Sequence, residues 1–130
     1  MRHYVDTSAA AKLLVEETES AALAAFLDQA LADGDTVGSS LLLETELRRL
    51  AIRLAISQEH VTLVLERLEL LMPDGDVFRT AGLLPGSSLR SLDALHVAAA
   101  LRWGADGVVT YHERQAVAVR AVGLSIAAPT

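Results

Sequence analysis

The chain has 130 residues, enough for one domain with a sizeable core, and 52% of them are hydrophobic, mostly Ala, Leu and Val. This composition excludes a disordered chain, and the absence of cysteine excludes a disulfide framework, a thiolate nucleophile and a cysteine zinc site. The net charge of −6 argues against a broadly basic nucleic-acid-binding surface, and with no apolar run of membrane-spanning length and no signal peptide we expect a single cytoplasmic domain over residues 1–130.

Strand and helix patterns alternate along the whole chain. The predicted strands cover residues 4–5, 36–40, 70–72, 108–110 and 124–127. The predicted helices cover residues 9–14, 20–32, 41–55, 57–69, 77–84, 92–103 and 113–122. This alternation predicts an α/β fold in three layers, with helices covering a central parallel sheet.

The ends of several elements carry capping residues. Thr7 and Ser8 are candidate caps of the first helix, and Ser91 is the candidate cap of the sixth. Gly104 is expected to stop the sixth helix. The acidic turn at 73–76 is typical of turn chemistry rather than of a metal loop.

Asp6 stands where the first strand ends and the first helix begins. Ligands of open α/β sheets bind outside the carboxyl ends of the strands, so an acid at this position lies where chemistry usually happens. The simpler alternative is that Asp6 only caps the helix.

Two further acids stand in similar positions. Glu44 follows the second strand closely and lies within an apolar run, although a surface ion pair with Arg48, four residues on, is the simpler alternative. Asp93 lies in the first turn of the sixth helix, where the helix dipole favours an ionised carboxylate. Acids are common at this position, so an ordinary first-turn Asp without a role in a site is the simpler alternative. If Asp6, Glu44 and Asp93 meet at one end of the sheet, a divalent cation relieves their repulsion, and Mg²⁺ or Mn²⁺ suits oxygen ligands.

Four segments together resemble the PIN-domain family, and within it the VapC-type toxins of bacterial toxin–antitoxin pairs. They are Tyr-Val-Asp-Thr-Ser-Ala at 4–9, the helix that carries Glu44, Ser-Leu-Asp-Ala-Leu-His-Val-Ala-Ala-Ala at 91–100 and Val-Val-Thr-Tyr at 108–111. The resemblance covers residues 2–129. It implies a small three-layer α/β/α fold and a Mg²⁺- or Mn²⁺-dependent endoribonuclease that forms a homodimer and is silenced by a small cognate antitoxin.

The same resemblance implies roles for individual residues. Asp6, Glu44 and Asp93 are then the catalytic, metal-binding acids, and the Ser8 and Thr110 hydroxyls line the site. These assignments make the expected reaction a metal-assisted hydrolysis of an RNA phosphodiester bond.

One segment departs from the family pattern. The family usually has a fourth acid two residues after the threonine of the fourth strand, and His112 stands at that position, with Glu113 one residue later. Either side chain is a candidate replacement. Because imidazole suits Mn²⁺ better than Mg²⁺, His112 favours a site biased toward Mn²⁺.

Basic residues and the remaining histidine of the motifs have weaker assignments. Arg48, Arg49 and Arg53 are candidates for RNA phosphate contacts, and an ordinary solvated helix surface explains them about equally well. We expect Leu92 of the sixth helix to face the core, and His96 to have a packing role rather than a catalytic one.

Other classes of protein fit the sequence less well. There is no phosphate loop and no dinucleotide-binding fingerprint, and Ser8 stands where an aspartyl phosphatase would need its second Asp. The main alternative is a PIN-like binding module, weakened or inactive as a nuclease, that works through protein partners. The many leucines between residues 41 and 71 are consistent with partner surfaces as well as with a core.

Overall fold

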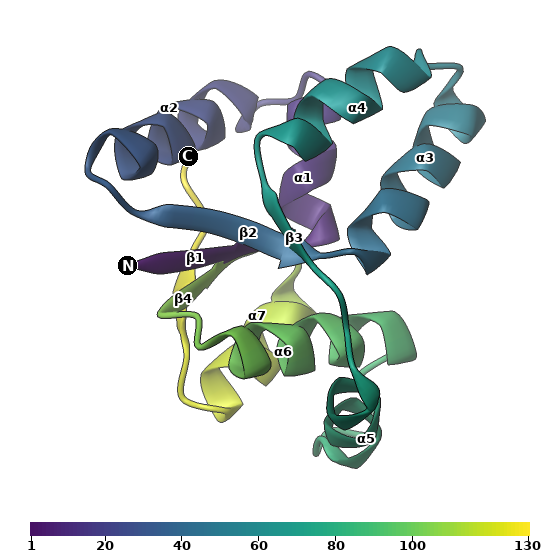
Figure 1. The fold of residues 1–130 in the computed structure, drawn as a ribbon, viewed down its shortest axis with the longest axis vertical. Coiled ribbons are helices and arrows are strands. Elements are labelled where there is room, and N and C mark those ends of the chain that lie inside the picture. The colour runs from purple at the N-terminus through teal and green to yellow at the C-terminus, as the bar shows by residue number, and fades with distance from the viewer.

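The computed structural model describes residues 1–130 as a five-stranded parallel sheet with helices on both faces (Figure 1). The strands are β1 (Arg2–Val5), β2 (Thr36–Ser40), β3 (Glu69–Leu71), β4 (Gly107–Val109) and β5 (Ser125–Ala127). The helices are α1 (Thr7–Leu14), α2 (Ser20–Ala32), α3 (Leu42–Leu54), α4 (Gln58–Glu66), α5 (Gly75–Leu83), α6 (Ser91–Trp103) and α7 (Glu113–Ala121). The predicted fold class is confirmed.

The strand order is β3-β2-β1-β4-β5, and every neighbouring pair is parallel. From β1 the chain first builds the sheet outward through β2 and β3, and it then returns to add β4 and β5 on the other side. The order therefore reverses between β1 and β4. In open α/β sheets this reversal creates the crevice in which ligands bind.

Alternating side chains of the central strands supply two separate cores. Val5, with Val37 and Val109 of the neighbouring strands, packs under α1 to α4, whereas Tyr4 and Val108 pack against α6 and α7. In Figure 1 the first group of helices lies on one side of the sheet and α5, α6 and α7 lie on the other. The central strands β1 and β4 are covered by helices on both faces, which explains why their sequences are mostly apolar.

One glycine lets the sheet and α6 approach each other closely. A Cβ atom at Gly38 of β2 would lie 2.8 Å from the Glu69 carbonyl oxygen and 2.9 Å from the Trp103 ring. Only glycine fits between them without a shift of one element.

The structure decides three sequence expectations about helix ends and faces. Asp6 caps α1, as the simpler alternative for this residue predicted, because its side chain accepts the Ala9 N–H, and Thr7 and Ser8, the other candidate caps, do not cap the helix. Arg90 occupies the cap position of α6 and makes no side-chain cap bond, so the expected cap, Ser91, is the first helical residue instead. Leu92 was expected in the core and is 49% exposed.

The other boundaries differ from the predicted ones by at most three residues. Gly104 ends α6 in the left-handed conformation, as expected. None of the helices combines the length and the apolar character that a membrane span needs.

Candidate functional site

Asp6 is a buried carboxylate at the carboxyl end of the central strand. Its side chain accepts hydrogen bonds from the Ala9 N–H at 3.0 Å, from the Ser8 hydroxyl at 2.7 Å and from the Thr110 hydroxyl. Thr110 directly follows β4, so the contact joins the two strands between which the sheet order reverses. Asp6 therefore lies in the crevice that the topology creates.

No cationic side chain pairs with Asp6. All three of its donors are neutral, and the residue is only 3% exposed. Burial raises the pKa of the Asp6 carboxyl, and the hydrogen bonds from Thr110, Ser8 and Ala9 oppose that rise. An ionised Asp6 is thus a buried charge that the chain itself leaves without a counterion.

The hydroxyl groups beside Asp6 are oriented by the main chain. The Ser8 hydroxyl oxygen accepts the Tyr111 N–H at 2.9 Å, and the Thr110 hydroxyl oxygen accepts the His112 N–H at 3.2 Å. Each hydroxyl then has its own proton free to donate to Asp6. The structure thus brings Ser8 and Thr110, both expected to line the site, to the Asp6 carboxylate.

Glu44 is not brought to Asp6. Its carboxylate accepts from the Arg48 guanidinium at 3.4 Å, one turn along α3, and the side chain is 44% exposed. This is the surface ion pair that the i,i+4 spacing also predicted, and such exposed pairs contribute little to stability. The structure corrects the expectation that Glu44 points at the sheet edge.

Glu46, two residues further along α3, contacts the residue next to Asp6. One of its carboxylate oxygens accepts from the Thr7 hydroxyl at 2.8 Å, and the other lies 2.6 Å from His96 Nε2. Thr7 is the residue next to Asp6, so Glu46 joins α3 to the start of α1. Its side chain is 18% exposed and retains access to solvent.

The sequence contained a signal for Glu46 that the spacing argument missed. The buried residues of α3 are Leu43, Leu47 and Ala51, with Leu50 packed against the same core. Glu46 lies three residues after Leu43 and four before Leu50, so a helical period places it on the inward side of the helix. A charged residue within an apolar stripe is a candidate for a site because burial of an unpaired charge is costly.

His96 is buried in α6 and links three elements. Its Nδ1 lies 2.7 Å from the Tyr4 hydroxyl of β1, and its Nε2 lies near both Glu46 and the Thr7 hydroxyl, the latter at 3.1 Å. Only 3% of the residue is exposed. The expectation of a packing role described its burial but missed these polar contacts.

Asp93 lies one turn before His96 on α6 and is partly buried. Its carboxylate forms no hydrogen bond within the chain, whereas its main-chain carbonyl accepts from Gln115 Nε2 of α7 at 3.1 Å. Residues three apart lie on the same side of a helix, so Asp93 projects from the side of α6 that carries His96. The other end of the Gln115 amide, Oε1, is buried without a partner.

The two candidate replacements for the fourth acid differ in their surroundings. His112 is half-buried at the start of α7, and its side chain makes no cap bond to the helix. The Glu113 side chain is 85% exposed, and its closest charged partner is Arg120 at 4.0 Å. The one-residue shift therefore turns Glu113 toward solvent, and His112 remains closer to the main chain that holds Thr110.

The three arginines of α3 also differ. Arg48 bonds to Glu44, Gln58 and Thr62 and so ties α3 to α4. Arg49 and Arg53 are exposed and form no ion pair. The latter two have guanidinium groups available for an anionic partner.

The acids do not form a closed metal cage. No group of three or more histidine or acidic side chains lies close enough together to hold an ion. The side-chain atoms at and around Asp6 are nonetheless carboxylate and hydroxyl oxygens, which are the metal ligands that Mg²⁺ and Mn²⁺ prefer. The unneutralised charge of Asp6 and this all-oxygen chemistry fit a divalent cation.

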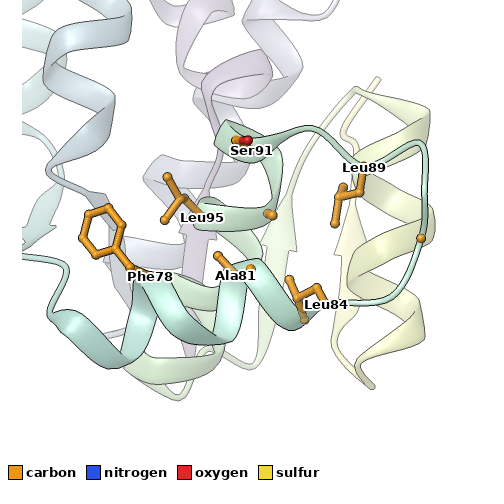
Figure 2. Close-up of a pocket in the computed structure, with 9 residues that line it drawn as sticks. Phe78, Ala81, Leu84, Leu89, Ser91 and Leu95 are labelled. Atoms are coloured by element: carbon orange, nitrogen blue, oxygen red, sulfur yellow. The ribbon is translucent and has the colours of Figure 1, made fainter.

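A separate apolar cavity of about 420 Å³ lies between α5 and α6. Figure 2 shows Phe78, Ala81, Leu84 and Leu95 around it, and none of the site acids contributes to its lining. The cavity lacks charged groups, so it is not a second candidate for hydrolytic chemistry.

Comparison with known proteins places the chain in a family. The family model of the PIN domain matches residues 3–120, and the chain belongs to this family. A curated relative, Ribonuclease VapC35 of Mycobacterium tuberculosis, is 41% identical over 135 residues, which cover 97% of this chain and 96% of the relative.

Solved structures with the same fold are far more distant in sequence. VapBC2 of Rickettsia felis, bound to a DNA fragment from its promoter, superposes with a TM-score of 0.72 at 17% identity, covering 98% of each chain. A toxin–antitoxin complex of Klebsiella pneumoniae superposes with a TM-score of 0.69 at 17% identity, again covering 98% of each chain. At such identities the likeness shows the fold.

Proposed function

We propose that this chain is a divalent-metal-dependent endoribonuclease, the toxin of a toxin–antitoxin pair, which hydrolyses RNA phosphodiester bonds and is neutralised by a cognate antitoxin. Membership of the PIN family and the 41% identity to a protein named as a ribonuclease support the activity. The observation that best supports the site is the position of Asp6. It is a buried carboxylate without a counterion, at the point where the strand order of the sheet reverses.

Asp6, Asp93 and one glutamate of α3 are the residues that we propose to hold the metal. Glu46 is the stronger glutamate, because it reaches the residue next to Asp6, whereas Glu44, the other candidate, is paired with Arg48 on the surface. A bound Mg²⁺ or Mn²⁺ would supply Lewis-acid stabilisation of the charge that develops on the phosphate.

The chain's own residues prepare the site for this chemistry. Ser8 and Thr110 fix the direction of the Asp6 carboxylate before any ligand binds, so no reorganisation is needed at that group. Glu46 is fixed in the same way by Thr7 and His96. Arg49 and Arg53 are proposed to contact RNA phosphates, which would make RNA affinity fall with salt without conferring sequence specificity.

A matched pair of variants on α3 tests the assignment of the glutamate. Glu46→Gln should reduce Mg²⁺- or Mn²⁺-supported cleavage of an RNA mixture by at least the roughly 10–100-fold that loss of a metal-supporting group costs. Glu44→Gln, two residues away on the same helix, should change cleavage by less than about threefold, because exposed ion pairs contribute little. The reverse order would return the role to Glu44.

Exposed apolar side chains support the proposal that this chain forms a homodimer and binds an antitoxin. One group follows β3 and continues along α5 and α6, namely Met72, Phe78, Leu83 and Leu92. A second group lies on α3 and α4, namely Ile52, Leu54 and Leu63. Large exposed apolar groups mark interaction surfaces. A monomer by light scattering at micromolar concentration, together with no small partner protein on purification from the native host, would contradict this part of the proposal.

The second candidate function is a PIN-like binding module with little nuclease activity. His112 favours it, because a neutral side chain stands where the family's fourth acid is expected, and Glu113 points to solvent. A chain that binds a partner protein but cleaves no RNA at any Mg²⁺ or Mn²⁺ concentration would support the module over the nuclease.

A further inference from the structure

A continuous chain of hydrogen bonds runs beneath the candidate site from β2 to α3. The Ser40 N–H donates to the Tyr4 hydroxyl oxygen at 3.1 Å, and the Tyr4 hydroxyl lies 2.7 Å from His96 Nδ1. On the other side of the ring, His96 Nε2 lies 2.6 Å from the Glu46 carboxylate. Tyr4, Ser40 and His96 are all buried, so water does not compete for the hydrogen bonds among these three residues.

The partners fix where each proton lies. A carboxylate can only accept, so the 2.6 Å contact requires His96 Nε2 to carry a proton and donate it to Glu46. The Tyr4 oxygen already accepts the Ser40 N–H, which leaves the tyrosine proton to be donated to Nδ1. The hydrogen-bond partners therefore assign the Nε2 proton to the bond with Glu46 and the Tyr4 proton to the bond with Nδ1.

This series of hydrogen bonds connects the two helix layers at the carboxyl ends of the strands. Glu46 belongs to α3, on the face that carries α1 to α4, whereas His96 belongs to α6 on the opposite face, as Figure 1 shows. Asp93 lies one turn before His96 on α6. The His96–Glu46 bond thus sets the spacing between the helix that carries Asp93 and the helix that carries Glu46.

We propose that His96 is a positioning residue: its Nε2–H, with the ring fixed by the Tyr4 hydroxyl, holds the Glu46 carboxylate at the carboxyl edge of the sheet. The role in metal uptake rests on the proposed function above. Glu46 receives one hydrogen bond on each oxygen, from His96 and from Thr7, and each carboxylate oxygen keeps a second lone pair for a cation. Groups that orient metal ligands in this way typically contribute 10–100-fold to metal affinity.

Two isosteric substitutions separate the two ends of the ring. In His96→Gln the side-chain amide nitrogen replaces Nε2 and still donates to Glu46, but nothing accepts from Tyr4. In His96→Asn the amide oxygen replaces Nδ1 and still accepts from Tyr4, but the donor to Glu46 is lost. Both variants remove the aromatic ring, so a role in packing alone predicts similar effects of the two.

Mn²⁺ binding without RNA, measured by titration calorimetry, is the readout. We expect His96→Asn to weaken Mn²⁺ binding about tenfold or more, and His96→Gln to stay within about threefold of the wild type. Glu44→Gln serves as the control that removes a charge from the same helix outside the network. Equal losses in the two His96 variants, no loss in either, or a larger loss in His96→Gln would overturn the positioning role.

A readout that needs no metal keeps the test decisive. Nitrogen NMR of the histidine ring in the metal-free protein should show His96 protonated at Nε2, and in Tyr4→Phe the Nδ1 signal should shift because its donor is gone. A ring protonated at Nδ1 alone would overturn the proposal. A wild-type protein that shows the expected ring state but takes up no Mn²⁺ would overturn the proposed metal centre and leave the positioning of Glu46 supported.

Discussion

The Thr110 hydroxyl donates a hydrogen bond to the Asp6 carboxylate, and this bond ties together the carboxyl ends of β1 and β4. The two residues are 104 positions apart in sequence. Their contact exists because the sheet order reverses between these two strands. The bond stabilises the fold and at the same time orients the acid on which the proposed chemistry depends.

Thr110→Val should destabilise the protein by about 1–3 kcal/mol, because it keeps the side-chain shape and leaves an oxygen of a buried carboxylate without its donor. Denaturant unfolding measures the loss. Thr36→Val is the matched control, since Thr36 also belongs to the sheet and its hydroxyl forms no side-chain bond. Equal midpoints for Thr110→Val and the wild type would show that the bond does not support Asp6.

Asp6→Asn should stabilise the metal-free protein at neutral pH. Burial raises the pKa of the Asp6 carboxyl. At a pH between the unfolded and the folded pKa, the folded protein therefore retains a proton that the unfolded chain has already released. The stability that this proton confers is present below the unfolded pKa of about 4 and is lost as the pH rises through the higher folded pKa. Asparagine still caps α1 and carries no charge.

Unfolding of the wild type and Asp6→Asn across the acidic to neutral range checks this sign. The wild type should lose stability relative to the variant as the pH rises. A saturating divalent cation should reverse the order by stabilising the wild type alone, by about 2.7 kcal/mol at one hundred times its dissociation constant. A wild type that gains stability relative to Asp6→Asn with rising pH and no metal would contradict the account.

Gln115→Met should raise the melting temperature. The Gln115 side chain is 1% exposed and its Oε1 has no partner, which costs about 1–3 kcal/mol for a buried polar group. Methionine has a similar shape and removes that oxygen. The bond from Nε2 to the Asp93 carbonyl is also lost, so we expect a net gain of about 1 kcal/mol. A lower melting temperature would show that the amide is satisfied in solution.

His112→Asp should raise Mg²⁺-supported RNA cleavage and lower the ratio of the cleavage rate with Mn²⁺ to the rate with Mg²⁺. The substitution supplies a carboxylate at the start of α7, beside the segment that holds Thr110, and Mg²⁺ prefers carboxylate oxygen to imidazole nitrogen. The ratio of cleavage rates with the two metals is the measurement, and Glu113→Gln, on an 85% exposed side chain, is the control. An unchanged ratio would show that His112 takes no part in metal choice.

The pattern of apolar residues predicted most of the fold, because the helices and strands alternate and are bounded by capping and turn residues. The strand at 36–40 and the helix at 20–32 agree with the structure at both ends. The cap of α1 stays open between Asp6, Thr7 and Ser8 in the sequence, because the sequence does not show which of three adjacent oxygen-bearing side chains turns back to the helix. The apolar pattern also places Leu92 in the core. In the structure the first turn of α6 extends beyond the core, and Leu92 is exposed.

The site was predicted less completely, because its contacts depend on which way each helix is rotated. Asp6 could be predicted from the strand end that it follows. Closeness to the second strand favours Glu44 in the sequence, whereas the rotation of α3 directs Glu46 to Thr7 and His96. The bond between Tyr4 and His96 joins residues 92 positions apart, and no spacing within one segment predicts it.

Cleavage of RNA by wild type, Asp6→Asn and Asp93→Asn, with Mg²⁺ or Mn²⁺ and with a chelator, tests the central claim most directly. We expect the wild type to cleave only with added metal, and each variant to lose at least about a hundredfold in rate while unfolding as cooperatively as the wild type. Cleavage at the wild-type rate by either variant, or undiminished cleavage in the chelator, would contradict the central claim.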